Sequence, residues 1–311
     1  MELINRIEDI TKPYKNAVLT IGNFDGVHIG HQALFEEVKK RARQINGTSI
    51  AMTFEPHPSR VLKQNGHPPL ITLYEQKIEL ISKHDLDVLI SVPFTKVFAE
   101  ISAQTFVEDL LVNRIGMKTI VVGNDYAFGK NREGNLEFLK KCSDRLRFNV
   151  VVWDWVSDPE NKLDRISSTK IRELIMAGNV ANARKPLGRY YQVRGTVETG
   201  RNRGGRLLGF PTANIHLKDE LCPMTGVYAV TVECKGRFYK GVANIGYSPT
   251  FNDHIFTVEV HILDFNSNIY GENIRVNFIE RLRDEVKFSH ISQLTDQIKK
   301  DIDKAKQILD R

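Results

Sequence analysis

Two histidines three residues apart lie where an apolar run gives way to a helical pattern. His28 and His31 occur in "TIGNFDGVHIGHQALFEEVKKRAR", residues 20–43. Residues at i and i+3 share a helical face, so both imidazoles can donate hydrogen bonds to one phosphate as it becomes pentacovalent. For an isolated pair of this kind, a structural or metal-binding role is the alternative. The glycine spacing matches neither GxGxxG nor GxxxxGK[ST], which argues against a nicotinamide-binding fold and a common kinase loop.

A second group of residues suited to binding phosphate occurs in "ISSTKIRELI", residues 166–175. Ser167, Ser168 and Thr169 can cap a helix N-terminus and bind phosphate oxygens. Arg172, one helical turn later, can add a charge-assisted, two-pronged contact. Alone, this segment would be interpreted only as a good helix cap.

The second half contains a Gly/Arg-rich stretch that leads into "GFPTAN", within residues 200–217. Arg203 and Arg206 beside flexible glycines predict a flap over nucleotide phosphates, whereas a single RGG is only a weak indication of RNA binding. Thr212 and Asn214 are two apart, so on extended backbone their side chains share one face. Hydroxyl and amide oxygens are suitable ligands for Mg²⁺ alongside phosphate.

Composition limits the class of protein. A length of 311 residues predicts two domains, and 41% apolar with 26% charged residues is typical of a chain that can bury a sizeable core. The net charge of +6 favours anionic partners without distinguishing nucleic acid, phosphorylated small molecules and membrane surfaces. The three cysteines form no CxxC pair, which indicates reduced thiols. With no signal-peptide pattern and no uninterrupted apolar run of membrane-spanning length, a cytoplasmic location is expected.

The first half must position the histidines on a sheet edge. Short apolar, β-branched runs alternate with helical patterns such as residues 34–45 and 74–84. This alternation predicts an α/β domain with a doubly wound parallel sheet covered on both faces. The runs occur at residues 17–21, 48–54, 86–92, 118–123 and 148–153.

The pattern changes near residue 185, where we place the boundary between domains 1–185 and 186–311. One or two short helices are expected just before it. Beyond it, alternating strands without crossover helices predict a C-terminal antiparallel β-barrel or sandwich, followed by a terminal helix at 291–309. The expected strands lie at residues 190–200, 226–236, 237–246, 256–265 and 273–282.

These motifs together resemble a known family. "GVHIGHQ" is similar to the HxGH signature of the nucleotidylyltransferase superfamily, and "ISSTKIR" to its second signature. "GFPTAN", continued by "GVYAV", "GVANIGYSPTF" and "VEVHILDF", resembles the riboflavin kinase motif. Nearly the whole chain is thus similar to the bacterial bifunctional riboflavin kinase/FAD synthetase family. The barrel is that of the kinase in this family, so the resemblance favours a barrel over a sandwich.

The resemblance implies two ATP-dependent reactions that require Mg²⁺. The C-terminal domain would phosphorylate riboflavin to FMN as a riboflavin kinase. The N-terminal domain would transfer AMP from ATP to FMN as an FMN adenylyltransferase, giving FAD and pyrophosphate. The expected partners are therefore riboflavin, FMN, FAD and ATP, with no nucleic acid and no membrane, and the oligomeric state stays open.

The resemblance also implies residue roles. Glu259 would be the general base for riboflavin's terminal hydroxyl, although alternation turns Val258 and Val260 inward and leaves it on the other face, where a surface acid is the alternative. Asp125 and Arg283 would contact the acceptor or flavin. The expected nucleotide- and phosphate-binding residues are Gly22, Asn23, Phe24, Asp25, His57, Ser167, Ser168, Thr169, Arg172, Arg206, Gly209, Pro211, Thr212 and Asn214.

Three further alternatives stay open, one for His57 and two for the function of the chain. His57, in "FEPHPSR", would lie in a loop merely stiffened by prolines if it met no phosphate. A single-activity adenylyltransferase fused to a flavin-binding or regulatory barrel would keep the same fold. A flavin-responsive regulator or nucleic-acid binder is the third alternative, motivated by the positive net charge.

Overall fold

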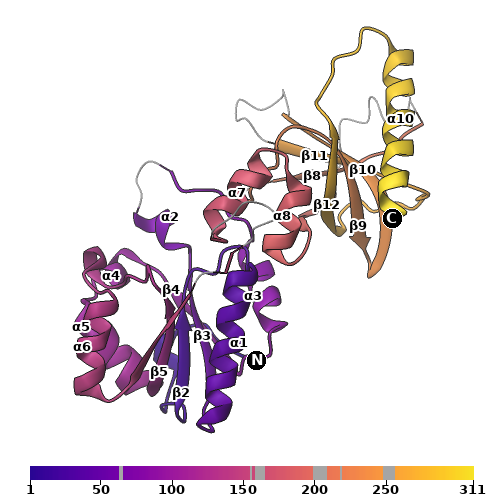
Figure 1. The fold of residues 1–311 in the computed structure, drawn as a ribbon. Coiled ribbons are helices and arrows are strands. Elements are labelled where there is room, and N and C mark those ends of the chain that lie inside the picture. The colour runs from indigo at the N-terminus through magenta and orange to yellow at the C-terminus, as the bar shows by residue number, and fades with distance from the viewer. Residues whose placement is uncertain (63–65, 155, 158–164, 199–208, 218, 248–255) are drawn as a thin grey trace. The chain divides into compact units, whose positions relative to one another are not determined.

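The computed structural model describes most of the chain and divides it into two compact units (Figure 1). The first unit comprises Met1–Pro68 and Thr72–Ser167, and the second comprises Pro69–Ile71 and Ser168–Arg311. The described residues are 1–62, 66–154, 156–157, 165–198, 209–217, 219–247 and 256–311.

The second unit includes the two short helices that precede the predicted domain boundary. They are α7 (Ser168–Met176) and α8 (Val180–Leu187), in the segment where one or two short helices were expected. The grouping by contacts therefore differs from the predicted division of the catalytic domains at residue 185, which stays a prediction.

The first unit contains a six-stranded sheet in the order β1-β4-β3-β2-β5-β6, with all neighbours parallel. This confirms the predicted parallel sheet. The first strand was not predicted, because three residues at a sheet edge form no apolar run. The strands are β1 (Glu2–Ile4), β2 (Ala17–Ile21), β3 (Ser49–Glu55), β4 (Val88–Pro93), β5 (Met117–Gly123) and β6 (Asn149–Trp153).

Helices cover both faces of this sheet (Figure 1). On one face, Phe35 and Val38 of α1 and Ile81 of α3 pack against sheet residues. On the other face, Leu111 of the π-helical segment η2 and Leu139 of α6 do the same. The fold is therefore doubly wound. The elements between the strands are η1 (Ile7–Asp9), α1 (Ile29–Gln44), α2 (Pro58–Leu62), α3 (Tyr74–Ser82), α4 (Lys96–Ala99), α5 (Ala103–Thr105), η2 (Phe106–Ile115), η3 (Lys130–Arg132) and α6 (Leu136–Leu146).

The strand order reverses between β2 and β5, which are neighbours in the sheet although they are far apart in sequence. In doubly wound sheets, ligands bind outside the carboxyl ends of the strands at such a switch point. The loops that leave β2, β3 and β5 at this edge carry His28, His57 and Asp125 respectively. The topology thus brings three separate predicted segments to one edge.

The second unit contains an antiparallel sheet in the order β7-β12-β9-β10-β11-β8. A bridge between Glu198 and Asn214 joins the two ends, so the sheet is a nearly closed barrel, as predicted. The strand β8 was not among the expected strands, although extended backbone was considered at Thr212 and Asn214, because its apolar alternation is too short to indicate a strand. The strands are β7 (Tyr191–Thr196), β8 (Ala213–His216), β9 (Gly226–Cys234), β10 (Arg237–Tyr247), β11 (Phe256–Ile262) and β12 (Asn273–Arg283).

The terminal helix α10 (Ile291–Leu309) has the predicted bounds. Its buried residues are Asp301 and Ala305, and Ala305 packs against Val227 and Leu282 of the sheet. Ile291, the first residue of the helix, is 72% exposed, so the apolar contacts with the sheet begin later in the helix. Among the helices of the described segments, none has the length and apolar character needed to cross a bilayer.

Candidate functional site

The corner after β2 is strained and tightly held. Phe24 and Val27 have left-handed backbone, with φ of 49° and 39°, beside Gly26 at 83°. Non-glycine residues in this region cost about 1–3 kcal/mol each and persist only where neighbouring structure fixes them. Here the Gly26 N–H donates to Thr72 Oγ1 at 3.0 Å, and the Gly22 N–H donates to the Met52 carbonyl at 3.0 Å.

The two predicted histidines lie together at the start of α1. Nδ1 of His28, the N-cap residue, accepts a hydrogen bond from the His31 backbone N–H at 3.4 Å, and the rings stack with centroids 3.5 Å apart. A Cβ on Gly30 would lie 3.1 Å from the His28 ring, so glycine permits this close approach. The pair therefore lies at a helix N-terminus, where the helix dipole favours an anion such as phosphate.

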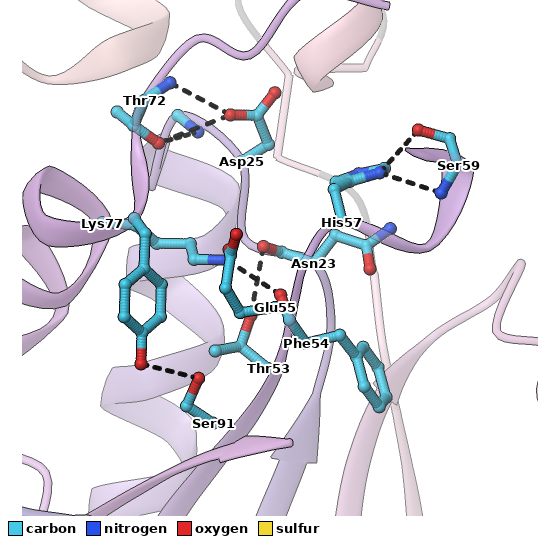
Figure 2. Close-up of polar contacts among 12 residues, drawn as sticks. Asn23, Asp25, Thr53, Phe54, Glu55, His57, Ser59, Thr72, Lys77 and Ser91 are labelled. Atoms are coloured by element: carbon cyan, nitrogen blue, oxygen red, sulfur yellow. Dashed lines mark hydrogen bonds and ion pairs between the residues drawn. The ribbon is translucent and has the colours of Figure 1, made fainter. Parts of the chain in front are cut away.

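The residues between Gly22 and Gly26 point in different directions. Asn23 is exposed, and its carbonyl accepts from Thr53 Oγ1 at 3.2 Å (Figure 2). The Phe24 ring is buried between His31 and Phe35 in edge-on contacts. The Phe24 ring thus packs against the His31 ring and helps to fix its position. The predicted nucleotide-binding role of the segment stays a prediction.

Asp25 is a buried acid at the same corner. Its Oδ1 accepts from the Thr72 backbone N–H at 3.1 Å and from Thr72 Oγ1 at 3.4 Å (Figure 2). These contacts give Asp25 a clear part in fixing the corner. Its predicted contact with a phosphate stays a prediction.

His57 follows β3 in a half-buried turn. Its Nδ1 lies 2.7 Å from Ser59 Oγ and accepts from the Ser59 backbone N–H at 3.2 Å (Figure 2). A neutral imidazole that accepts at Nδ1 carries its proton on Nε2. The turn therefore presets His57 to donate from Nε2, the form required by its predicted contact with phosphate oxygen.

Asp125, after β5, is paired with an arginine that the sequence did not identify. Arg165 Nη2 donates to Asp125 Oδ2 at 2.7 Å, and the two residues are 40 apart in sequence. Nearby, Asn124 Nδ2 donates to Asp154 Oδ1 at 3.2 Å. The only available signal was a basic residue two positions before the "SST" motif.

The "SSTKIR" motif spans the division between the two units. Ser167 ends the first unit, and α7 begins at Ser168, in agreement with the predicted helix start. Arg172 Nε donates to the Pro69 carbonyl at 2.9 Å within the second unit. The predicted binding of phosphate by this motif stays a prediction.

In the second unit, the predicted general base and metal ligand are cross-strand partners. Glu259 on β11 lies directly opposite Asn214 on β8, so their side chains leave the same face of the sheet. Val258 and Val260 are fully buried, as predicted, which leaves Glu259 exposed on the outer face. Thr212 lies two residues before Asn214, and its carbonyl accepts from Asn214 Nδ2 at 3.5 Å.

The environment of Glu259 favours a base. Surrounding protein atoms raise the pKa of its carboxyl by partial desolvation, and the negative charge of Glu285 adds to this, although the side chain still reaches solvent. Asn244, opposite Glu259 on β10, donates to Glu285 Oε1 at 3.3 Å. A carboxylate with a raised pKa is a stronger proton acceptor.

The remaining residues of this unit that were predicted to bind phosphate are Gly209, Pro211 and Arg206. The Pro211 carbonyl lies 2.9 Å from His261 Nδ1, and Gly209 has a φ of 79°. Arg206 lies outside the described residues, as does Arg203. Their predicted phosphate contacts stay predictions.

Arg283 is engaged within the protein. Its Nε lies 3.0 Å from both carboxylate oxygens of Asp301, and its Nη2 lies 2.7 Å from Oδ2. Nη1 donates to the Asp284 carbonyl at 2.8 Å. The arginine thus ties β12 to α10, and its predicted flavin contact stays a prediction.

Breaking this ion pair is expected to destabilise the second unit. Asp301→Ala leaves the Arg283 guanidinium partly buried without its carboxylate, at a cost of about 3–5 kcal/mol. Urea unfolding followed by circular dichroism measures the loss. The control Asp303→Ala removes an exposed acid from the same helix and should change stability by less than about 0.5 kcal/mol. Equal effects of the two variants would contradict the assignment.

Comparisons with known proteins match both halves of the chain. A family model described as FAD synthetase matches residues 10–170, and one described as riboflavin kinase matches residues 187–309. The bifunctional riboflavin kinase/FMN adenylyltransferase of Haemophilus influenzae is 38% identical over 98% of this chain and 98% of its own. The protein of that name from Listeria monocytogenes is 40% identical over 92% of this chain and 90% of its own.

A solved structure shares the whole fold. A crystal structure described as a macrolide-efflux protein from Streptococcus pneumoniae superimposes with a TM-score of 0.86 at 36% identity. The match covers 97% of each chain. That description differs from the names of the curated relatives, which agree with the two family models.

Proposed function

The chain belongs to the bifunctional riboflavin kinase/FMN adenylyltransferase family, and we propose that the residues described above form its two catalytic sites. The enzyme phosphorylates riboflavin with ATP to give FMN, and it transfers AMP from a second ATP to FMN, giving FAD and pyrophosphate. The observation that supports both activities is the presence of both family matches, in order, in one chain.

AMP transfer is proposed at the edge where β2, β3 and β5 end. An oxygen of the FMN phosphate attacks the α-phosphorus of ATP, the new P–O bond forms, and the bond to pyrophosphate breaks. His28 and His31 donate hydrogen bonds to the charge that develops on this phosphate. No side chain need act as a nucleophile, so catalysis depends on positioning and charge stabilisation.

Further contacts to ATP and FMN are proposed for two loops at this edge and, separately, for the "SSTKIR" motif. His57 donates from Nε2 to a phosphate oxygen, and Asp125, held by Arg165, orients the acceptor. Ser167, Ser168, Thr169 and Arg172 are proposed to bind the triphosphate through hydroxyl groups, the α7 N-terminus and a guanidinium.

Riboflavin phosphorylation is proposed at the outer face of the barrel. Glu259 accepts the proton of the terminal hydroxyl of riboflavin as that oxygen attacks the γ-phosphorus of ATP; the new P–O bond forms, the bond to the β,γ-bridging oxygen breaks, and ADP leaves. Thr212 and Asn214 would supply a hydroxyl and an amide oxygen to hold Mg²⁺, and the position of Asn214 opposite Glu259 supports this arrangement. Mg²⁺ prefers oxygen ligands and usually retains water and substrate phosphates, so this small donor set fits it.

The proposal is tested by product analysis and metal removal. Purified protein mixed with riboflavin, ATP and Mg²⁺ should produce FMN and then FAD on a chromatogram. Excess EDTA should stop both products, and added Mg²⁺ should restore them, because the metal would neutralise phosphate charge in both transfers. Undiminished product formation in EDTA would rule out the metal requirement. A cytoplasmic location, with neither nucleic acid nor membrane as partner, stays a prediction.

A further inference from the structure

A buried lysine lies near the sheet edge where β2, β3 and β5 end, at which AMP transfer is proposed. Lys77, on α3, is 4% exposed, and its Nζ donates to the Phe54 carbonyl at 3.2 Å (Figure 2). Its distance to Glu55 Oε2 is 3.6 Å, which is an ion-pair distance and not a hydrogen-bond distance. Burying an ammonium group costs free energy unless opposite charges and hydrogen bonds compensate. A buried lysine is therefore expected to have a specific structural or functional role.

The negative charges near Lys77 belong to two different segments of the proposed site, the end of β3 and the corner after β2. Burial lowers the pKa of the Lys77 ammonium, while the negative charges of Glu55 and Asp25 act in the opposite direction. Glu55 ends β3, two residues before His57, and Asp25 belongs to the strained corner before His28. Two carboxylates beside a triphosphate would repel it, and the ammonium offsets that repulsion.

The residues around Lys77 hold three strand ends at once. Thr72 contacts Asp25 and Gly26 after β2, as described above. Tyr74 Oη donates to Ser91 Oγ on β4 at 2.9 Å, and Lys77 holds the end of β3 (Figure 2). Residues 72–77 therefore connect the carboxyl ends of three parallel strands.

We propose that Lys77 is a positioning residue for AMP transfer: its buried ammonium fixes the end of β3, and with it the His57 turn, against the corner that carries His28. It touches no substrate and acts through the Phe54 carbonyl and Glu55. The inference rests on the proposed placement of AMP transfer in the first unit. The sequence presents Lys77 only as one residue of a helical pattern.

The test uses the full chain and both of its reactions. Lys77→Met keeps the length and apolar stem of the side chain but removes its charge and its donor. The rate of FAD formation from FMN, as kcat/KM, should fall by about 10- to 100-fold, because small displacements in a positioned site cost that much. FMN formation from riboflavin, which uses the second unit, should remain within twofold. The control Lys83→Met removes an exposed lysine, paired with Glu79 at 3.3 Å, from the end of the same helix and should leave both rates unchanged.

Further variants separate positioning from packing. Lys77→Arg keeps the charge and should recover more FAD formation than Lys77→Met, measured well below the thermal transition of each variant. If Lys77→Met lowers only the unfolding temperature, or if Lys77→Arg is as impaired as Lys77→Met, the positioning role is overturned.

Two more results complete the test. Where Lys77→Met does not fold, Glu55→Gln removes the partner charge, and FAD formation should fall at least fivefold; an unchanged rate overturns the inference. His28→Ala distinguishes a failure of the Lys77 role from a failure of the proposed adenylylation site. If it abolishes FAD formation while Lys77→Met has no effect, only the role of Lys77 fails. If His28→Ala has no effect either, the proposed adenylylation site itself is wrong.

Discussion

Replacing His28 by alanine is expected to abolish FAD formation and to leave FMN formation from riboflavin intact. The imidazole lies at the α1 N-terminus, stacked on His31, where it can donate to the phosphate that becomes pentacovalent. Removing one such donor costs about 10²–10³ in rate. Chromatographic yields of FMN and FAD from riboflavin, ATP and Mg²⁺ measure both reactions in one tube, so the kinase reports whether the protein is folded and active.

A matched variant separates chemistry from helix capping. His28 is also the N-cap of α1, and losing a cap costs about 1 kcal/mol of stability. His28→Asn supplies a good N-cap without an imidazole, so it should restore stability while FAD formation stays low. Recovery of FAD formation in His28→Asn would show that His28 serves only as a cap.

Replacing Glu259 by glutamine should have the opposite effect on the two products. Without a carboxylate to accept the hydroxyl proton, FMN formation from riboflavin should fall by about 10²–10⁴-fold. FAD formation from supplied FMN should remain unchanged, because it takes place in the other unit. Glutamine has nearly the same shape, and Glu259 lies on the outer face, so the barrel core of Val258 and Val260 is preserved.

The control for this variant is another glutamate of the same barrel. Glu233→Gln alters β9 at a partly exposed ion pair with Arg275, 3.5 Å long, which contributes little to stability. Both reactions should proceed normally in this variant. A kinase rate in Glu259→Gln equal to that of the control would exclude Glu259 as the base.

The fold was largely predictable from sequence because its strands are either buried on both faces or alternate strictly. Continuous apolar runs such as residues 17–21 indicated the parallel sheet, and alternation at Val258 and Val260 indicated the barrel. Both strands that were missed are recognisable only through their partners. The three residues of β1 pair with β4, and β8 is made extended by its ladder with β11.

The candidate site was predictable to the extent that its signals are local. His28 and His31 lie in one motif, as do Thr212 and Asn214, so each pair could be singled out as a candidate from the sequence, while its role is what the family resemblance implies. Arg165 and Lys77 could not be assigned in this way, because their partners are distant in sequence. Arg165 binds Asp125, and Lys77 binds the end of β3, and neither contact leaves a pattern in the chain.

The strand that bears the kinase motif also forms the seam of the barrel. On one side, β8 is joined to β11 by a continuous ladder, but on the other, among the residues that the structure describes, it meets the rest of the sheet through one bridge, between Glu198 and Asn214. A strand anchored along one edge can tilt about that edge while the remaining ladders stay intact. We therefore expect entry of the phosphate donor to require only a hinge-like displacement of one border, at little energetic cost to the barrel as a whole.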